Sequence, residues 1–98
     1  MIRVILCDID GTIANVLHRI NYVKGKEKNW EEFNSRANND SVKEDIANIL
    51  REFYKDNETE IHIVTGREDK WKQDTEEWLK VNDIPFHGLY MRGLGDAR

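Results

Sequence analysis

Three short apolar segments separated by two helical patterns constrain the fold of this chain more than any other feature. Residues 2–7 form a near-continuous run rich in β-branched side chains, and residues 60–65 and 86–91 form two further runs of strand character. Between them, residues 42–55 and 69–82 carry apolar side chains on one face at helical spacing. The order strand, helix, strand, helix, strand predicts an α/β layer fold with about three parallel strands and right-handed crossovers.

The stretch between the first strand and the first long helix has no clear period. Within residues 13–41, only residues 30–37 show a helical pattern, with Trp30 and Phe33 expected to face inward. We therefore expect a small flap or cap region over residues 13–41, inside a single domain that covers residues 1–98. A region of this length is too short for a full cap domain, so the site beneath it stays open to large substrates.

The start of the helix at 42–55 carries a capping signal. Asp40 and Ser41 are both residue types that cap helices, and Glu44 follows Ser41 by three residues. This spacing predicts a capping box in which the two side chains satisfy the first amide groups of the helix.

Composition excludes several classes of protein. No apolar run approaches the roughly 18–20 residues of a membrane span, and the first residues lack the pattern of a secretory signal. A single cysteine, Cys7, excludes an internal disulfide framework and a cysteine-based zinc site, so we expect a reducing, cytoplasmic compartment. The formal net charge of −4 argues against a surface that coats nucleic acid.

Positive charge is concentrated in residues 13–28, which hold Arg19, Lys24, Lys26 and Lys28 against Glu27 alone. This patch, in an otherwise acidic chain, indicates a local anionic ligand. A solvated loop with scattered lysines is an equally good reading of charge alone, and both stay open.

Ligands of open α/β sheets bind beyond the carboxyl ends of the strands, so the residues that follow each strand are the candidates for chemistry. They offer carboxylates, hydroxyls, flexible glycines and guanidinium groups: Asp8, Asp10, Gly11 and Thr12 after the first strand, Thr65, Gly66 and Arg67 after the second, and Arg92 after the third. These residues predict one shared site.

Two carboxylates separated by one residue suit phosphoryl transfer. One of Asp8 and Asp10 can act as the nucleophile that forms an acyl phosphate, while the other handles protons. A hard cation such as Mg²⁺ relieves the repulsion between the two acids. A calcium loop would need an oxygen ligand and a glutamate where this sequence has Thr12 and Arg19, so that reading fails.

The segment Asp8-Ile9-Asp10-Gly11-Thr12 resembles motif I of the haloacid-dehalogenase-like (HAD) phosphotransferases, and Val64-Thr65-Gly66-Arg67 resembles their motif II. The longer stretches ILCDIDGTIANVLHR, IVTGRE and IPFHGLYMRGLGDAR resemble the phosphatase domain of phage polynucleotide kinase–phosphatases. The resemblance spans nearly the whole chain. It implies a small Rossmann-like three-layer sandwich of HAD type.

The resemblance also implies a role for each matching residue. Asp8 would be the nucleophile, and Asp10 the general acid and then the base, for which a pKa nearer the working pH would be suitable. Mg²⁺ would be held by the Asp8 carboxylate and the Asp10 main-chain carbonyl. The remaining matches would bind phosphate or line the pocket: Thr65, Gly66 and Arg67, the amides near Gly11 and Thr12, and the side chains of His18, Arg19 and Arg92.

Two further motifs of the family have no counterpart in this sequence. In the relatives, the motif III lysine and the motif IV acids lie beyond the segment that matches residues 95–98. We therefore expect a C-terminally shortened fold with residues 2–7 at the edge of the sheet. An apolar edge strand is a docking site, so we expect pairing through this edge with a second copy or a partner protein. The alternative, that the sequence is a fragment or the product of an early-terminated gene, stays open.

Two functions are consistent with these residues. The first is a Mg²⁺-dependent phosphohydrolase that removes phosphate from a nucleotide or a polynucleotide 3′ end through an aspartyl-phosphate intermediate. The alternative is a catalytically weak or inactive HAD-like protein that binds phosphate or nucleotide, or acts as an inhibitor. Base stacking by one of Trp30, Trp71 and Trp78 is an open possibility, although their spacing favours core packing.

Overall fold

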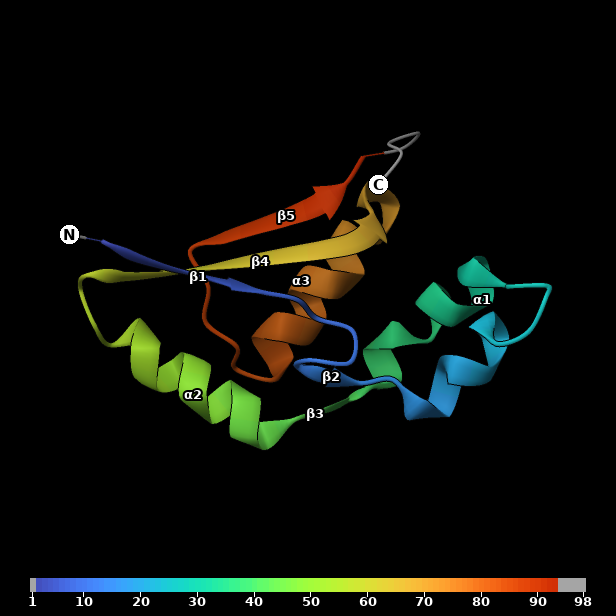
Figure 1. The fold of residues 1–98 in the computed structure, drawn as a ribbon, viewed down its shortest axis with the longest axis horizontal. Helices are drawn as coiled ribbons and strands as arrows, with labels where there is room; N and C mark the ends of the chain where they lie inside the picture. Colours follow the sequence, from blue (N-terminus) through green and yellow to red (C-terminus); the bar gives the residue numbers. More distant parts are fainter. Residues whose placement is uncertain (1, 94–98) are drawn as a thin grey trace.

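A computed structural model of the chain describes residues 2–93. Its main sheet has three strands, β1 (Arg3–Cys7), β4 (Thr59–Glu68) and β5 (Gly88–Arg92), in the order β1-β4-β5 (Figure 1). Both pairings are parallel. The α/β class and the three parallel strands are therefore confirmed, and β1 lies at an edge of the sheet that residues 2–93 form.

Two longer helices connect the strands. Helix α2 (Glu44–Tyr54) leads from the flap to β4, and α3 (Lys72–Val81), preceded by the 3₁₀ turn η3 (Asp69–Trp71), leads from β4 to β5. Both agree with the predicted helices to within a few residues. No helix among residues 2–93 has the length and apolar character needed to cross a bilayer.

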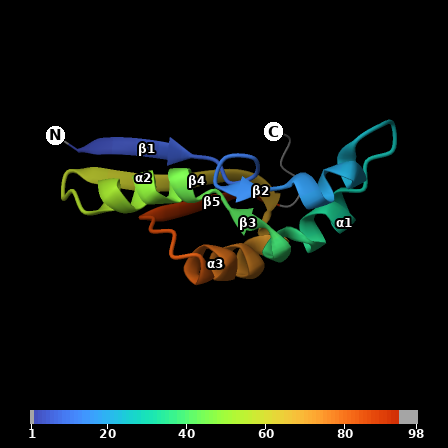
Figure 2. The same cartoon turned by 90° about the horizontal axis from the view of Figure 1, so that it is seen from below.

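Both helices pack on the same face of the sheet (Figures 1 and 2). Ile61 and Ile63 of β4 are fully buried, and they belong to one cluster with Leu50 of α2 and with Trp78 and Leu79 of α3. This arrangement follows from the order of the strands, because two right-handed crossovers that step in the same direction place their helices on the same side.

The opposite face of the sheet is exposed in the part of the chain that the structure describes. Val4 and Leu6 of β1 are 56% and 71% exposed, and Val64 and Tyr90 on the neighbouring strands are also exposed. Residues 2–93 thus contribute two layers of the expected three-layer sandwich, the helices and the sheet.

The flap, residues 13–41, lies beyond the carboxyl ends of β1 and β4 (Figure 1). Its elements are short: β2 (Ala14–Asn15), the 3₁₀ helix η1 (Leu17–Val23), α1 (Trp30–Ser35) and the 3₁₀ turn η2 (Ala37–Asn39). Phe33 is buried as predicted, whereas Trp30 is 54% exposed, so the inward orientation expected for Trp30 is wrong. Helix α1 has only six residues, and Phe33 is the one that is buried.

The predicted capping box at the start of α2 is also wrong. Ser41 belongs to a two-residue strand, β3 (Ser41–Val42), which pairs with β2. Lys43 stands at the N-cap of α2 without a capping side chain, and its main-chain amide donates to the Ile13 carbonyl at 2.7 Å. The strand pairing fixes the backbone of Ser41 before the helix begins, and this prevents Ser41 from capping it.

Candidate active site

A pocket of about 320 Å³ lies at the carboxyl ends of β1 and β4. Strands β4 and β5 and the loop after β1 contribute charged and polar residues: Asp8, Asp10, Thr65, Gly66, Arg67, Glu68 and Arg92. Helix α1 of the flap contributes Trp30, Phe33 and Asn34. The structure therefore brings six predicted residues to one pocket, although their individual roles stay predictions. Gly11, Thr12, His18 and Arg19 are not part of its lining.

Asp8 directly follows β1 and begins a tight loop. The Ile9 amide donates to Asp8 Oδ1 at 2.8 Å, while the Ile9 side chain is fully buried and fixes the loop to the core. Gly11 has a φ of +80°, a conformation that favours glycine because a Cβ would be strained there. The loop thus directs two carboxylates toward the pocket while its backbone turns away.

The main-chain amides of this loop are used within the loop. The Gly11 amide donates to the Ala14 carbonyl at 3.0 Å, and the Thr12 amide donates to the Ile9 carbonyl at 3.1 Å. In this conformation, neither amide is directed at a ligand. Phosphate binding by Gly11 and Thr12 stays a prediction that requires the loop to rearrange.

The motif II residues lie inside β4, whereas the sequence predicted them after the strand. Thr65 and Arg67 are buried and Gly66 is exposed, so the alternation of the strand continues through them. The pairing of β4 with β5 is irregular between Val64 and Glu68. This irregularity lies at the residues of β4 that line the pocket.

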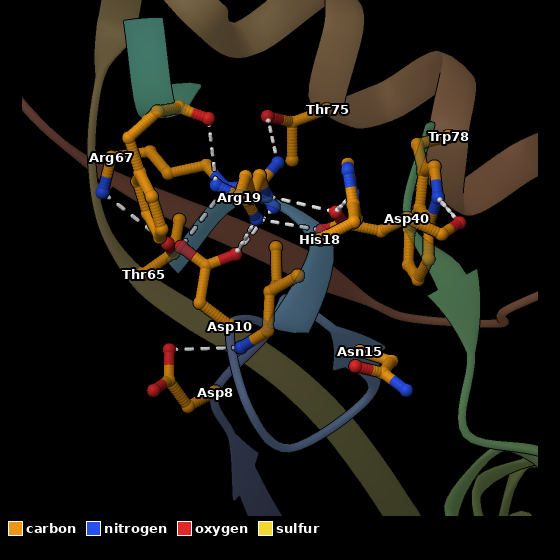
Figure 3. Close-up of polar contacts among 12 residues, drawn as sticks. Asp8, Asp10, Asn15, His18, Arg19, Asp40, Thr65, Arg67, Thr75 and Trp78 are labelled. Carbon is orange, nitrogen blue, oxygen red and sulfur yellow. Dashed lines mark hydrogen bonds and ion pairs between the residues drawn. The ribbon is translucent and has the colours of Figure 1, made fainter. Parts of the chain in front are cut away.

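Asp10 lies between two guanidinium groups (Figure 3). Its Oδ1 accepts a hydrogen bond from Arg19 Nη2 at 2.8 Å and from Arg67 Nη2 at 2.6 Å. Arg67 is itself held by Thr75 of α3, because Arg67 Nη1 donates to Thr75 Oγ1 at 3.0 Å. Asp10 is therefore fixed from two sides, by the flap and by the sheet.

Arg19 is fully buried, although the resemblance placed it only along the pocket wall. Its guanidinium group donates to Asp40 Oδ1 at 2.8 Å and to Asp40 Oδ2 at 2.6 Å, as well as to the Phe33 carbonyl at 3.0 Å. The Asp40 side chain is also fully buried and contacts His18 Nε2. A buried, bidentate ion pair of this kind holds Arg19 rigidly against Asp10.

These contacts determine the charge of Asp10. Burial raises the pKa of its carboxyl group, but hydrogen bonds and attraction from Arg67 and Arg19 outweigh burial and lower the pKa below its ordinary value. The structure thus favours the ionised form of Asp10, opposite in direction to the raised pKa that would be suitable for a general acid. Burial opposes the charge of Arg19, yet Asp40 and Asp10 raise its pKa.

Two residues of the site, Asp40 and Thr75, could not be found from the sequence pattern. Asp40 had the residue type of a helix cap, and Thr75 carried no functional signal. Their contacts depend on how distant segments meet: Asp40 binds Arg19 across 21 residues, and Thr75 binds Arg67 from the next helix.

The oxygen atoms near Asp8 suit a hard cation. The Asp10 carboxylate is engaged by Arg19 and Arg67, which leaves the Asp8 carboxylate and the Asp10 main-chain carbonyl as the predicted ligands. Mg²⁺ is commonly held by one or two protein oxygens, with water and substrate phosphate in its other positions, so the donor chemistry fits. Within residues 2–93, no three acidic, histidine or cysteine side chains gather as a metal site.

A family model described as the polynucleotide kinase PNKP phosphatase domain matches residues 2–98. The chain belongs to this family. Membership in the family supports a HAD-type phosphatase domain, in agreement with the resemblance of motifs I and II.

Relatives of known description agree with this family. A protein of Autographa californica nuclear polyhedrosis virus, described as a bifunctional polynucleotide kinase/RNA ligase, is 28% identical over 96 residues. Two solved structures of the Pnkp1/Rnl/Hen1 RNA repair complex contain a chain that is 26% identical, with a TM-score of 0.76 in each case. These matches cover 97–98% of this chain but only 12% of the viral protein and 27% and 29% of the solved chains.

Proposed function

We propose that this chain removes a phosphate group from a nucleotide or a polynucleotide 3′ end, with Mg²⁺ and with Asp8 as the nucleophile. The observation that carries the proposal is the shared pocket, in which Asp8 lies beside Asp10 and the motif II residues of β4. The family supports the general activity, whereas the substrate, the metal and the steps below are proposals.

In the first step, an oxygen of the Asp8 carboxylate attacks the phosphorus atom, and the bond between phosphorus and the leaving oxygen breaks. Asp10 donates a proton to that leaving oxygen. Because the pKa of Asp10 is lowered in the free protein, it must gain this proton once substrate is bound. The negative charge of the phosphate next to Asp10 favours protonation.

In the second step, Asp10 removes a proton from a water molecule, and that water attacks the phosphorus atom of the aspartyl phosphate. The bond between phosphorus and the Asp8 oxygen breaks, inorganic phosphate leaves, and Asp8 is regenerated. The lowered pKa of Asp10 keeps it ionised before substrate binds. A bound Mg²⁺ would supply charge that offsets the repulsion between Asp8 and the phosphate.

Arg67 lies between the Asp10 carboxylate and the space for the substrate. It lines the pocket and also binds Asp10, so an incoming phosphate competes with Asp10 for its guanidinium group. Arg19 has no such freedom, because Asp40 holds it with two hydrogen bonds. We assign Arg67 to the phosphate and Arg19 to the position of Asp10.

The experiment that tests the proposal measures release of inorganic phosphate from p-nitrophenyl phosphate and from a 3′-phosphorylated oligonucleotide, with Mg²⁺ and with a chelator. Asp8→Asn should abolish release, and Asp45→Asn, an exposed substitution in the first turn of α2, should leave it unchanged. Release that persists in Asp8→Asn would overturn the mechanism. Binding of the oligonucleotide without release would favour the alternative of a phosphate-binding protein.

We also propose that a second copy of the chain or a partner protein covers β1. The strand lies at the edge of the described sheet, and its Val4 and Leu6 side chains are exposed. Both an open edge and an apolar face favour association. The RNA repair complex of the solved relatives contains several proteins, which is consistent with a protein partner.

A further inference from the structure

Trp30 is an exposed aromatic side chain at the mouth of the candidate active site. It lines the same pocket as Asp8, Thr65 and Arg67, yet 54% of its surface is accessible to solvent. By contrast, core packing leaves Trp78 of α3 only 3% exposed. The flap thus holds a large apolar ring in water beside a polar site that contains two arginines and three acidic residues.

The ring is anchored through the residues that fix the catalytic carboxylate. Trp30 contacts Phe33 edge to face, with the ring centroids 5.6 Å apart and an interplanar angle of 86°. The guanidinium group of Arg19 lies over the Phe33 ring, 4.1 Å from the ring centroid. Arg19 in turn binds Asp10. The position of the Trp30 ring relative to Asp10 is therefore set by packed side chains.

The pocket has room for more than a phosphate group. A water molecule takes up about 30 Å³ of liquid, so 320 Å³ corresponds to roughly ten water molecules. A phosphate group has five heavy atoms. The space between the phosphate-binding residues and α1 can accept part of the group to which the phosphate is attached.

Positive charge lies on the flap beside the Trp30 ring. The Lys28 ammonium lies 5.9 Å from the centroid of the Trp30 ring, and Lys24 and Lys26 are exposed on the same segment. An aromatic ring next to cations is the arrangement that binds single-stranded nucleic acid, because bases stack on the ring and the backbone phosphates contact the cations.

We propose that Trp30 is the stacking platform for the nucleobase of the terminal nucleotide, and that it makes the site selective for phosphate attached to a nucleoside. This inference rests on the proposed function, since it names the substrate feature that the same pocket recognises. Stacking is tolerant of base identity because every base has an aromatic face. Trp30 therefore selects nucleotides over phosphate esters without a base, with little preference among the four bases.

The test is equilibrium binding in the Asp8→Asn background, which separates affinity from turnover. Two 3′-phosphorylated oligonucleotides are compared, one with a normal terminal nucleotide and one whose terminal nucleotide lacks its base. Asp8→Asn alone should bind the normal end roughly 5- to 150-fold more tightly than the abasic end, the range expected for one stacked base. Adding Trp30→Ala should reduce this ratio to near one, and Trp30→Phe should restore most of it.

Tyr54→Ala is the matched control, because Tyr54 is an exposed aromatic residue at the end of α2, away from the pocket. It should leave the ratio unchanged. A ratio that survives Trp30→Ala, or that is already near one without it, would overturn the stacking role, as would failure of Asp8→Asn to bind either oligonucleotide. Phosphate release by the unmodified chain is measured separately, so a failed stacking role and a failed phosphatase activity give different results.

Discussion

Asp8 and Asp10 are chemically identical side chains two positions apart, and their surroundings make them different. The loop amide of Ile9 is the hydrogen-bond donor to Asp8, whereas Asp10 receives hydrogen bonds from two guanidinium groups. Those two cations keep Asp10 ionised and fixed in place. In the proposed mechanism, the environment, and not the residue type, thus separates the nucleophile from the group that handles protons.

Asp10→Asn tests the proton-transfer role. The amide keeps the size of the side chain but can neither donate the proton to the leaving oxygen nor activate water, so kcat should fall by about 10²- to 10⁴-fold. Phosphate release from the 3′-phosphorylated oligonucleotide measures the effect, with Asp45→Asn as the control. Turnover near that of the unmodified chain would exclude Asp10 as acid and base.

Gly66→Ala separates a binding requirement from a structural one. Gly66 does not have a positive φ, and a Cβ built there meets no atom within 4 Å, so the free energy of unfolding should change by less than about 0.5 kcal/mol. Because Gly66 lines the pocket, the added methyl group should obstruct phosphate and raise KM. Urea unfolding and steady-state kinetics measure the two effects. A large loss of stability, or an unchanged KM, would contradict the assignment.

At the scale of elements, the flap is connected to the rest of the chain by the buried Arg19, by the hydrogen bond from Trp78 Nε1 to the Asp40 carbonyl and by a surface ion pair, among other contacts. Arg19 reaches from η1 to Asp10 on the first loop, and Lys70 of η3 pairs with Glu31 of α1. The surface pair is exposed and contributes little, whereas the buried network cannot lose one partner without leaving a charge unpaired.

Arg19→Met should therefore destabilise the chain by about 3–5 kcal/mol, because the buried Asp40 would lose its guanidinium partner and keep only the contact with the His18 ring. Chemical unfolding measures this change. Arg36→Met is the matched control: Arg36 pairs with Glu32 on the exposed side of α1, and its removal should leave the midpoint nearly unchanged. Equal effects of the two substitutions would show that the buried network does not hold the flap.

The sheet and its helices could be predicted because local periodicity and burial coincide there. Ile61 and Ile63 alternate in β4, and both long helices have one apolar face. The flap could not be predicted in detail, since its short elements are held by contacts with distant residues. Asp40 is an example, because its preference for a helix cap is outweighed by pairing with Arg19.

The candidate site could also be predicted only in part from the sequence. The rule that ligands bind at the carboxyl ends of parallel strands was sufficient to group Asp8, Asp10 and the motif II residues. It could not reveal that Arg19 lies behind Asp10 rather than in the pocket, or that Trp30 faces solvent. Those features depend on how the flap packs, and the spacing of residues carries no information about that packing.

At the scale of the whole molecule, one face of the sheet packs against helices and the other exposes apolar side chains among the described residues. If a second copy covers this face, Leu6→Lys should weaken self-association, because it places a charge on a side chain that is 71% exposed at the edge strand. Sedimentation velocity across a concentration series measures this. If the unmodified chain stays monomeric at every concentration, pairing with a second copy is excluded. A partner protein then remains as the proposed occupant of this face.

In the proposed mechanism, Asp8 carries the phosphoryl group during turnover. The direct measurement is a single-turnover reaction with an oligonucleotide that bears a radiolabelled 3′-phosphate, quenched in acid and followed by peptide mapping. We expect label on the peptide that contains Asp8 and none in Asp8→Asn. Release of phosphate by the unmodified chain at full rate without label on that peptide, or full activity in Asp8→Asn, would contradict this mechanism.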